Sequence, residues 1–240
     1  MERLDKRGTT IRDMFAGVAP RYDLLNHLLS ASLDRVWRRR AARALSLPSG
    51  SRVLDLCCGT GDQALALHRL GLEVTATDFC LPMLALAERK YARRGGQGAR
   101  HLAGAAGDAL ALPFPPEAFD GATVAFGLRN VADLPAALGE IGRVLKPGGH
   151  VAFLEFATPR RQPLRGLYLL YFKHLLPAIA RLLSPRGSAY GYLRDSVLSF
   201  PQREAFIQVM TTAGYSQSAW RDLSAGIVCL YTGTRDGELT

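Results

Sequence analysis

The chain has 240 residues, of which 48% are hydrophobic and 21% charged, so it can bury one sizeable core but hardly two. Its four cysteines form no Cys-x-x-Cys pair, which argues against a zinc site, a redox dithiol or a disulfide framework. The net charge of +9 favours anionic partners: nucleic acid, an acidic membrane surface or a charged substrate.

From residue 52 onward, strands alternate with helices. The predicted strands cover residues 52–56, 72–77, 100–105, 119–126 and 150–156, and the predicted helices cover 62–70, 82–94 and 134–145. A basic helical extension at 1–50, with a helix over 32–47, precedes them. An apolar helical insertion at 158–200, a helix ending near Gly214 and a strand pair at 215–223 and 226–232 follow. This pattern predicts one α/β domain over 1–240, with a Rossmann-like, mostly parallel sheet, a C-terminal antiparallel strand pair and helices on both faces.

No segment is typical of a membrane span or a secretory signal. The first residues are polar and charged, without an apolar run. The most apolar stretch, residues 164–183, is interrupted by Arg165, Lys173, His174 and Arg181. We therefore expect a cytoplasmic protein.

The sharpest motif is Asp55-Leu56-Cys57-Cys58-Gly59-Thr60-Gly61-Asp62, a strand end, a glycine-rich turn and a helix start. Glycines let a ligand approach the backbone closely. The spacing Gly59-x-Gly61-x-x-Ala64 also satisfies the dinucleotide fingerprint, so NAD is a rival ligand. Asp62 argues against a pyrophosphate at the helix start, because two anions repel. S-adenosylmethionine (SAM) carries an ammonium and a sulfonium instead, for which Asp55 and Asp62 are suitable neighbours.

Two more acidic residues follow the next two predicted strands. Asp78 is expected to accept hydrogen bonds from ribose hydroxyls, although it also suits a helix cap. Asp108 is expected to accept from the adenine amino group, with Ala109 offering its backbone amide, although a plain turn aspartate is an alternative. Carboxylates after three successive strands favour SAM.

The fourth predicted strand ends in Phe126-Gly127-Leu128-Arg129-Asn130-Val131. It lacks both the Asn/Asp-Pro-Pro-aromatic sequence of nucleic-acid N-methyltransferases and the Pro-Cys pair of cytosine C5 methylation. Arg129 is a candidate to bind a phenolate, and a surface arginine on the sheet edge is the alternative.

At this point the sequence resembles the ubiquinone/menaquinone biosynthesis C-methyltransferases over nearly its whole length. The motifs that carry the resemblance are Ala19-Pro20-Arg21-Tyr22-Asp23-Leu24-Leu25-Asn26, Gly59-Thr60-Gly61-Asp62, Phe126-Gly127-Leu128-Arg129-Asn130, Lys146-Pro147-Gly148-Gly149 and Tyr190-x-Tyr192-Leu193. Two positions depart from the family pattern: Ala125 replaces a serine of some members, and Asp108 replaces a frequent asparagine.

The resemblance implies methyl transfer from SAM, released as S-adenosylhomocysteine, to a ring carbon of a prenylated hydroquinone such as demethylmenaquinol. The cofactor contacts expected from the motifs and the resemblance are Asp55, Gly59, Thr60, Gly61, Asp78, Asp108 and Ala109. The expected catalytic residues are Arg129, which stabilises phenolate character, and Asn130. The expected substrate contacts are Tyr22, Arg129, His174, Tyr190 and Tyr192. The ring proton passes to a water-linked carboxylate or to one of the last three residues, and a packed His174 is an alternative.

A lipid acceptor gives the helical insertion a purpose. Its leucines form an apolar stripe that is expected to line a prenyl channel or rest on the inner face of the cytoplasmic membrane, unless it is ordinary core. Arginines between Arg35 and Arg43 are expected to meet anionic headgroups or solvent. We expect no nucleic-acid partner, and leave open a homodimer or a quinone-synthesis complex. The competing classes are an RNA or other small-molecule methyltransferase, a SAM-binding protein without activity and an NAD-dependent oxidoreductase.

Overall fold

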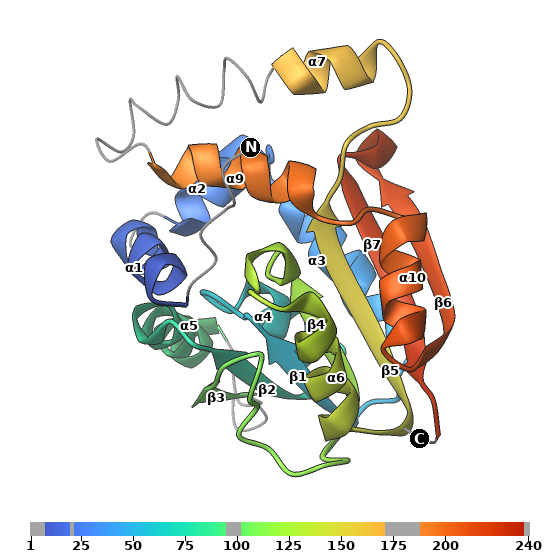
Figure 1. Ribbon diagram of the computed structural model, residues 1–240. Coiled ribbons are helices and arrows are strands. Elements are labelled where there is room, and N and C mark those ends of the chain that lie inside the picture. Colours follow the sequence, from blue (N-terminus) through green and yellow to red (C-terminus); the bar gives the residue numbers. More distant parts are fainter. Residues whose placement is uncertain (1–7, 20–21, 95–101, 171–187, 238–240) are drawn as a thin grey trace.

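One seven-stranded sheet forms the centre of the computed structural model, which describes residues 8–19, 22–94, 102–170 and 188–237 (Figure 1). The strand order is β3-β2-β1-β4-β5-β7-β6. The strands are β1 (Arg52–Leu56), β2 (Glu73–Asp78), β3 (Leu102–Ala106), β4 (Phe119–Ala125), β5 (Leu145–Phe156), β6 (Tyr215–Leu223) and β7 (Val228–Arg235). Neighbouring strands from β3 to β5 are parallel, and β7 is antiparallel to both β5 and β6. The predicted fold class is confirmed.

Helices cover both faces of this sheet. They are α1 (Gly8–Val18), α2 (Tyr22–Leu29), α3 (Leu33–Ala44), α4 (Asp62–His68), α5 (Leu81–Arg94), α6 (Leu134–Val144), α7 (Leu164–Leu170), α9 (Ser188–Ser199) and α10 (Glu204–Thr212). Helices α3, α4 and α5 pack on one face, and α6 and α10 on the other. Successive residues of β1 therefore enter different cores, Val53 with the first group and Leu54 with the second. Burial on both faces explains why these strands are nearly continuous apolar runs.

Strand β5 begins earlier than the sequence predicts. The turn residues 146–149 lie inside it as a bulge, because Phe119 pairs with Leu145 whereas Gly121 pairs with His150. Gly148 supplies the left-handed backbone of this bulge, with φ of 74°. The Lys-Pro-Gly-Gly sequence therefore marks a kink in a long strand.

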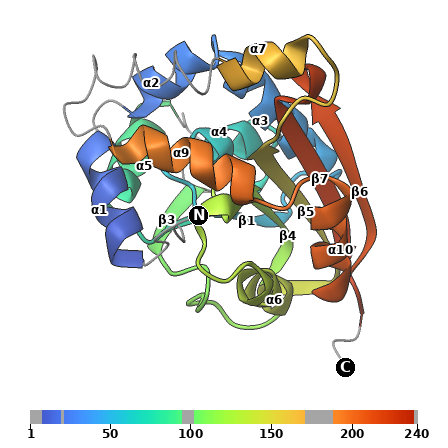
Figure 2. The same cartoon turned by 45° about the horizontal axis from the view of Figure 1, so that its top comes forward.

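Helix α9 crosses the carboxyl end of the sheet, and α1, α2 and α7 surround the same end (Figures 1 and 2). Helix α9 contacts the short 3-10 helix η3 (Leu128–Asn130) that follows β4. The predicted helical insertion thus lies over the strand ends where residues 158–170 and 188–200 are described. His174 and the segment 171–187 lie outside the described residues, and the division into a single domain with two helical additions stays a prediction.

Candidate active site

A pocket opens at the carboxyl end of the sheet, where β1, β2 and β4 meet. We call it the strand-tip pocket. Its lining residues are Gly8, Ile11, Phe15, Tyr22, Leu56, Cys57, Gly59, Asp78, Phe79, Cys80, Met83, Gly107, Asp108, Ala109, Leu110, Ala125, Phe126, Gly127, Asn130, Val131 and Ala132. Strand order reverses between β1 and β4, and ligands of open α/β sheets bind at such a switch point.

Two strained backbone turns form the floor of the pocket. Cys57 after β1 and Phe126 after β4 both have left-handed backbones, with φ of 54° and 65°. The two turns touch: a Cβ on Gly127 would lie 2.4 Å from Cys57 Cβ, so only glycine fits there. Burial, followed by the nearby carboxylates of Asp78 and Asp55, raises the pKa of the Cys57 thiol well above its ordinary value. This shift favours the neutral thiol at the pocket wall.

Asp78 at the end of β2 is the central carboxylate of the pocket. It is 6% exposed, and it accepts hydrogen bonds from the Gly59 N–H and the Cys80 N–H, each at 2.8 Å. Burial raises the pKa of Asp78, although these amides oppose that shift. Each carboxylate oxygen keeps a lone pair for a ligand hydroxyl. Gly59 and Asp78 thus lie together at the pocket, as the sequence predicts.

Asp108 and Ala109 lie beyond β3 on the same pocket wall. The Asp108 side chain accepts a hydrogen bond from the Leu110 N–H at 3.0 Å and is exposed, whereas Ala109 is buried. Asp108 therefore makes the hydrogen bond of a turn aspartate and also lines the pocket. Its contact with the adenine amino group stays a prediction.

Three other predicted cofactor residues do not line the pocket. The Thr60 hydroxyl donates to the Asp23 carboxylate and accepts from Lys90 Nζ at 3.2 Å, on the far side of the turn. Gly61 faces the ring of Tyr91, whose hydroxyl oxygen would lie 2.2 Å from an added Cβ. The expected contacts of these two residues with the cofactor stay predictions.

Asp55 is the third. It is fully buried within the sheet, and it accepts a hydrogen bond from the Thr123 hydroxyl at 3.0 Å. Burial raises the pKa of Asp55 to about 7, against the opposing effects of Thr123 and Arg38. The Asp55 carboxyl lies inside the sheet and is not part of the pocket lining, and its expected place beside the cations of a methyl donor stays a prediction.

Asp62 also has a different partner from the one expected. Its carboxylate lies 2.8 Å from Lys90 Nζ and 3.6 Å from His27 Nε2. Burial raises the pKa of Asp62, but Lys90 and the other nearby cations outweigh it, so the pKa lies below its ordinary value. Lys90 also contacts Asp23 at 2.6 Å, and His27 contacts Asp34 at 3.0 Å. This network of ion pairs holds α2 against the rest of the protein. Within it, the Lys90 ammonium already compensates the charge of Asp62.

Arg129 and Asn130 follow β4 directly, but their side chains have different surroundings. The Arg129 guanidinium is 3.0 Å from the buried carboxylate of Glu155 and also donates to the Phe126 carbonyl. Arg129 does not line the strand-tip pocket, and its expected contact with a phenolate stays a prediction. Asn130 does line it, and its Oδ1 has no hydrogen-bond partner within the described part of the chain.

The N-terminal helices supply a wall that sequence reasoning largely missed. Ile11 and Phe15 of α1 line the pocket together with Tyr22 of α2, and the rings of Phe15 and Tyr22 meet edge to face at 6.0 Å. The signal available was that Tyr22 lies in a recognised motif, but nothing in the motif shows that α1 folds back over the sheet. Tyr22 is therefore at the pocket, as predicted.

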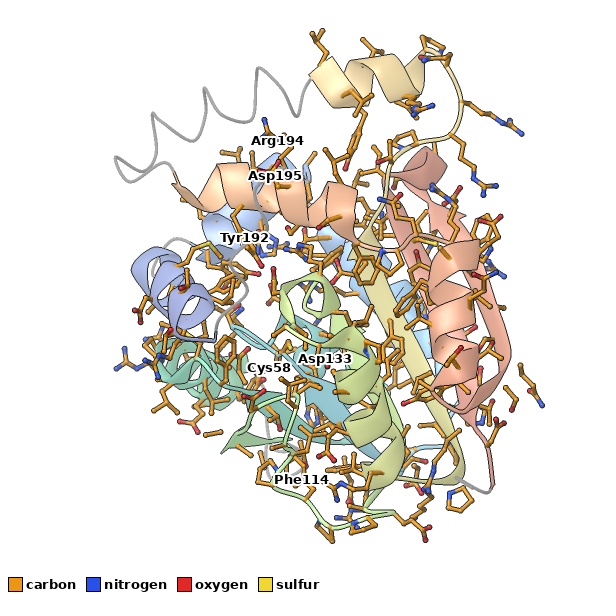
Figure 3. All side chains as sticks on the ribbon, viewed as in Figure 1. Cys58, Phe114, Asp133, Tyr192, Arg194 and Asp195 are labelled. Carbon is orange, nitrogen blue, oxygen red and sulfur yellow. The ribbon has the colours of Figure 1, made fainter. Side chains whose placement is uncertain are left out.

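The remaining predicted substrate contacts lie on α9 or outside the described residues. Tyr192 projects from the side of α9 that faces the strand ends, whereas Arg194 lies on the opposite side (Figure 3). Tyr192 is half-buried and is not part of the pocket wall. The side chain of Tyr190 and all of His174 fall outside the described residues, so their roles stay predictions.

The donor set of the pocket fits SAM. Among the described residues, the wall contains the carboxylates of Asp78 and Asp108 and no lysine, arginine or histidine. A cationic methyl donor is attracted to such a wall, and a pyrophosphate is repelled. Glycines at 59 and 127 give the close backbone approach that a nucleoside needs.

Comparison with known proteins decides the family. The model of the ubiE/COQ5 methyltransferase family matches residues 3–235. The chain belongs to this family. It is 44% identical over 238 residues to the ubiquinone/menaquinone biosynthesis C-methyltransferase UbiE of Geobacter sulfurreducens, covering 98% of this chain and 92% of that one. It is 46% identical over 224 residues to the demethylmenaquinone methyltransferase of Thermus thermophilus, covering 92% and 100%.

A solved structure agrees on the fold. The SAM-dependent methyltransferase from Thermotoga maritima superposes with a TM-score of 0.63 at 21% identity, covering 93% of this chain and 99% of that one. Membership of the ubiE/COQ5 family makes the chain a SAM-dependent methyltransferase, and the predicted family, enzyme class and cofactor are confirmed. Among its described helices, none has the length and apolar character needed to cross a membrane.

Proposed function

We propose that this methyltransferase transfers the methyl group of SAM to a ring carbon of a prenylated hydroquinone, in menaquinone or ubiquinone synthesis. The names of its relatives, a ubiquinone/menaquinone biosynthesis C-methyltransferase and a demethylmenaquinone methyltransferase, support this acceptor. The observation that carries the proposal is the composition of the strand-tip pocket: aromatic and aliphatic side chains surround two carboxylates and one unpaired amide oxygen, that of Asn130. Such a wall accepts a flat, apolar ring that offers a hydroxyl.

Three residues would hold the cofactor. Asp78 would accept from the ribose hydroxyls, Asp108 would accept from the adenine amine, and Gly59 lets the nucleoside lie against the backbone. When bound, SAM supplies an electrophilic methyl group on a sulfonium. Ile11 and Phe15 of α1 and Tyr22 of α2, which line the pocket, would shield that group from water.

Asn130 would act on the acceptor. A hydroquinone hydroxyl that donates to Asn130 Oδ1 gains phenolate character, which raises the electron density on the neighbouring ring carbons. This role replaces the expected direct contact of Arg129, whose guanidinium is paired with Glu155. The ring proton would then pass through water to a carboxylate, or to Tyr190, Tyr192 or His174, and the sequence does not choose among these acceptors.

A panel assay tests the proposal. Radiolabelled SAM is incubated with the protein and a series of reduced demethylquinones, and the products are identified by mass. We expect label in at least one quinol and none when the same quinone is left oxidised, because an oxidised ring has no hydroxyl to donate. Label in RNA or in a water-soluble phenol alone, or tight binding of NAD with no affinity for S-adenosylhomocysteine, would contradict it.

The route of a lipid acceptor is a second part of the proposal. Exposed leucines gather on helices at the pocket end of the sheet: Leu24 and Leu28 on α2, Leu167 and Leu170 on α7, and Leu198 on α9 (Figure 2). Arg35 and Arg39 of α3 are also exposed, whereas Arg38 is buried over the Phe126 ring and is removed from the expected basic surface. We propose that this end rests on an anionic bilayer, so that the prenyl chain stays in lipid while the ring enters the pocket.

Liposome flotation tests the membrane contact. The wild type is expected to float with anionic vesicles at low salt and less at high salt. The variant Leu167→Asp/Leu170→Asp is expected to lose flotation, whereas Leu70→Asp, an exposed leucine after α4 and remote from the pocket end, keeps it. Equal flotation of both variants, or none for the wild type, would contradict the proposal. A homodimer or quinone-synthesis complex stays a prediction, as does the absence of a nucleic-acid partner.

A further inference from the structure

Glu155 is a charged residue with no solvent contact at the end of β5. It lies beside the tip of β4, since Leu154 pairs with Ala125 and the Leu154 carbonyl accepts from the Phe126 N–H at 2.8 Å. Glu155 belongs to none of the sequence motifs, and it does not line the strand-tip pocket. A carboxylate is costly to bury in such a position unless it is paired and hydrogen-bonded.

Both the backbone and the side chain of Arg129 bind the Glu155 carboxylate. The Arg129 backbone N–H donates to Oε1 at 3.1 Å, and its guanidinium donates to Oε2 at 3.0 Å. The Phe156 N–H adds a third hydrogen bond at 3.3 Å. Arg129 is itself 6% exposed and lies over the Phe156 ring, 5.5 Å from its centroid. The pair is thus buried, and each member supplies the charge that the other requires.

This pair fixes the turn that carries Asn130. The chain reverses at Phe126, whose backbone is left-handed and whose carbonyl accepts from the Arg129 guanidinium. The short helix η3 then closes with the Asn130 N–H donating to the Gly127 carbonyl at 3.0 Å. A rigid turn held at Arg129, one residue before Asn130, sets the direction in which the Asn130 amide enters the pocket.

We propose that Glu155 is a positioning residue for methyl transfer: through Arg129 it holds η3 so that Asn130 Oδ1 faces the acceptor. The inference rests on the proposed function, because it assigns the acceptor hydroxyl to Asn130. It also accounts for the arginine of the Phe-Gly-Leu-Arg-Asn motif, which here serves the protein and not the substrate.

Kinetics separate positioning from a merely structural role. Glu155→Gln keeps the shape and removes the charge, whereas Glu155→Asp keeps the charge and withdraws the carboxylate by one methylene. Because a misplacement of about 1 Å costs on the order of 100-fold in rate, we expect kcat to fall by about that factor in Glu155→Gln, with the affinity for S-adenosylhomocysteine changed by less than about threefold. Glu155→Asp is expected to lie between this variant and the wild type. The double variant Glu155→Gln/Asn130→Ala should be no slower than Asn130→Ala alone, since both changes remove the same contact.

The control is Asp222→Asn. Asp222 pairs with the buried Arg203 at 2.9 Å on the far edge of the sheet, away from the pocket. The Asp222→Asn variant should have a lower melting temperature than the wild type and the same kcat. If kcat in the Glu155 variants falls only as far as in Asp222→Asn at matched stability, or if the effects of Glu155→Gln and Asn130→Ala multiply, the positioning role is wrong.

A crystal structure of Glu155→Asp beside the wild type decides the matter independently of activity. We expect β4 and β5 to superpose while η3 and the Asn130 amide shift. An unmoved Asn130 overturns the inference even if the variant is slow. If instead the wild type methylates no quinol, the proposed function fails, and the position of Asn130 in the two crystals still tests the role of Glu155.

Discussion

Replacing Gly127 by alanine tests the contact between the two turns on which the pocket rests. The new Cβ would lie 2.4 Å from Cys57 Cβ and 3.0 Å from Val124 Cγ1. Carbon atoms attract best at about 3.5 Å, so the turns after β1 and β4 must separate by about 1 Å. Neither neighbour can move away easily, because Cys57 Cβ is bonded directly to a strained backbone and Val124 Cγ1 belongs to a stiff, β-branched side chain. Overpacking of this kind costs about 1–3 kcal/mol in stability, and a displacement of this size costs on the order of 100-fold in rate.

The assay for Gly127→Ala combines urea unfolding with calorimetry of S-adenosylhomocysteine and methyl transfer to a reduced demethylquinone. Gly139 of α6 provides the matched control, since nothing lies within 4 Å of a Cβ added there. Gly139→Ala is expected to stabilise the protein by about 0.5–1 kcal/mol through helix propensity and to leave binding unchanged. If Gly127→Ala matches this control in stability, cofactor affinity and turnover, the close approach of the two turns has no functional meaning.

Three further predictions concern charged residues. Asp78→Asn is expected to weaken S-adenosylhomocysteine by about 100-fold in calorimetry, since hydrogen bonds to a charged group are worth about 1.5–3 kcal/mol; a loss under about threefold would show that this carboxylate does not bind the ribose. Lys90→Met leaves Asp62 without the ammonium at 2.8 Å, and should lower the free energy of unfolding by about 2 kcal/mol and speed proteolysis of α2; an unchanged proteolysis rate would contradict the network's role. Asp55 has a folded-state pKa of about 7 against 3.8 unfolded, so the folded state holds the extra proton, and stability should fall by up to about 4 kcal/mol between about pH 4 and pH 7. Urea titrations should show a flatter pH profile for Asp55→Asn, and an equal slope in both proteins would refute the raised pKa.

The fold was accessible from sequence because its signals are local. Apolar runs of strand length predict β1 to β4 to within two residues. The bulge in β5 was not accessible, since Lys146-Pro147-Gly148-Gly149 has the composition of a turn and only pairing with β4 shows that the strand continues through it. Likewise, α1 and α2 are amphipathic, but nothing in their own sequences shows that the surface they cover is the pocket at the end of the sheet.

The site was predictable only where a residue's position in the strand fixes its direction. Asp78 and Gly59 follow directly from the ends of β2 and β1, and both lie at the pocket. Thr60 and Arg129 lie in equally strong motifs, yet both turn away, because their partners are distant in the chain: Asp23 is 37 residues from Thr60, and Glu155 is 26 residues from Arg129. A motif establishes which residue types occupy a turn, whereas the charge opposite each side chain decides which way it points.

The preference for a cationic cofactor likewise depends on the charges around the pocket and not on the motif alone. Asp62 does not create it, because Lys90 already neutralises that carboxylate. The preference comes from the whole wall, where Asp78 and Asp108 face the pocket and none of the described lining residues is basic. The chain has a net charge of +9, yet none of its described cations lines this wall. The pocket therefore favours a cationic ligand although the protein as a whole attracts anions. Introducing one, as in Ala132→Lys at the rim, should therefore weaken S-adenosylmethionine more than it weakens its uncharged-sulfur product, since only the former carries the sulfonium.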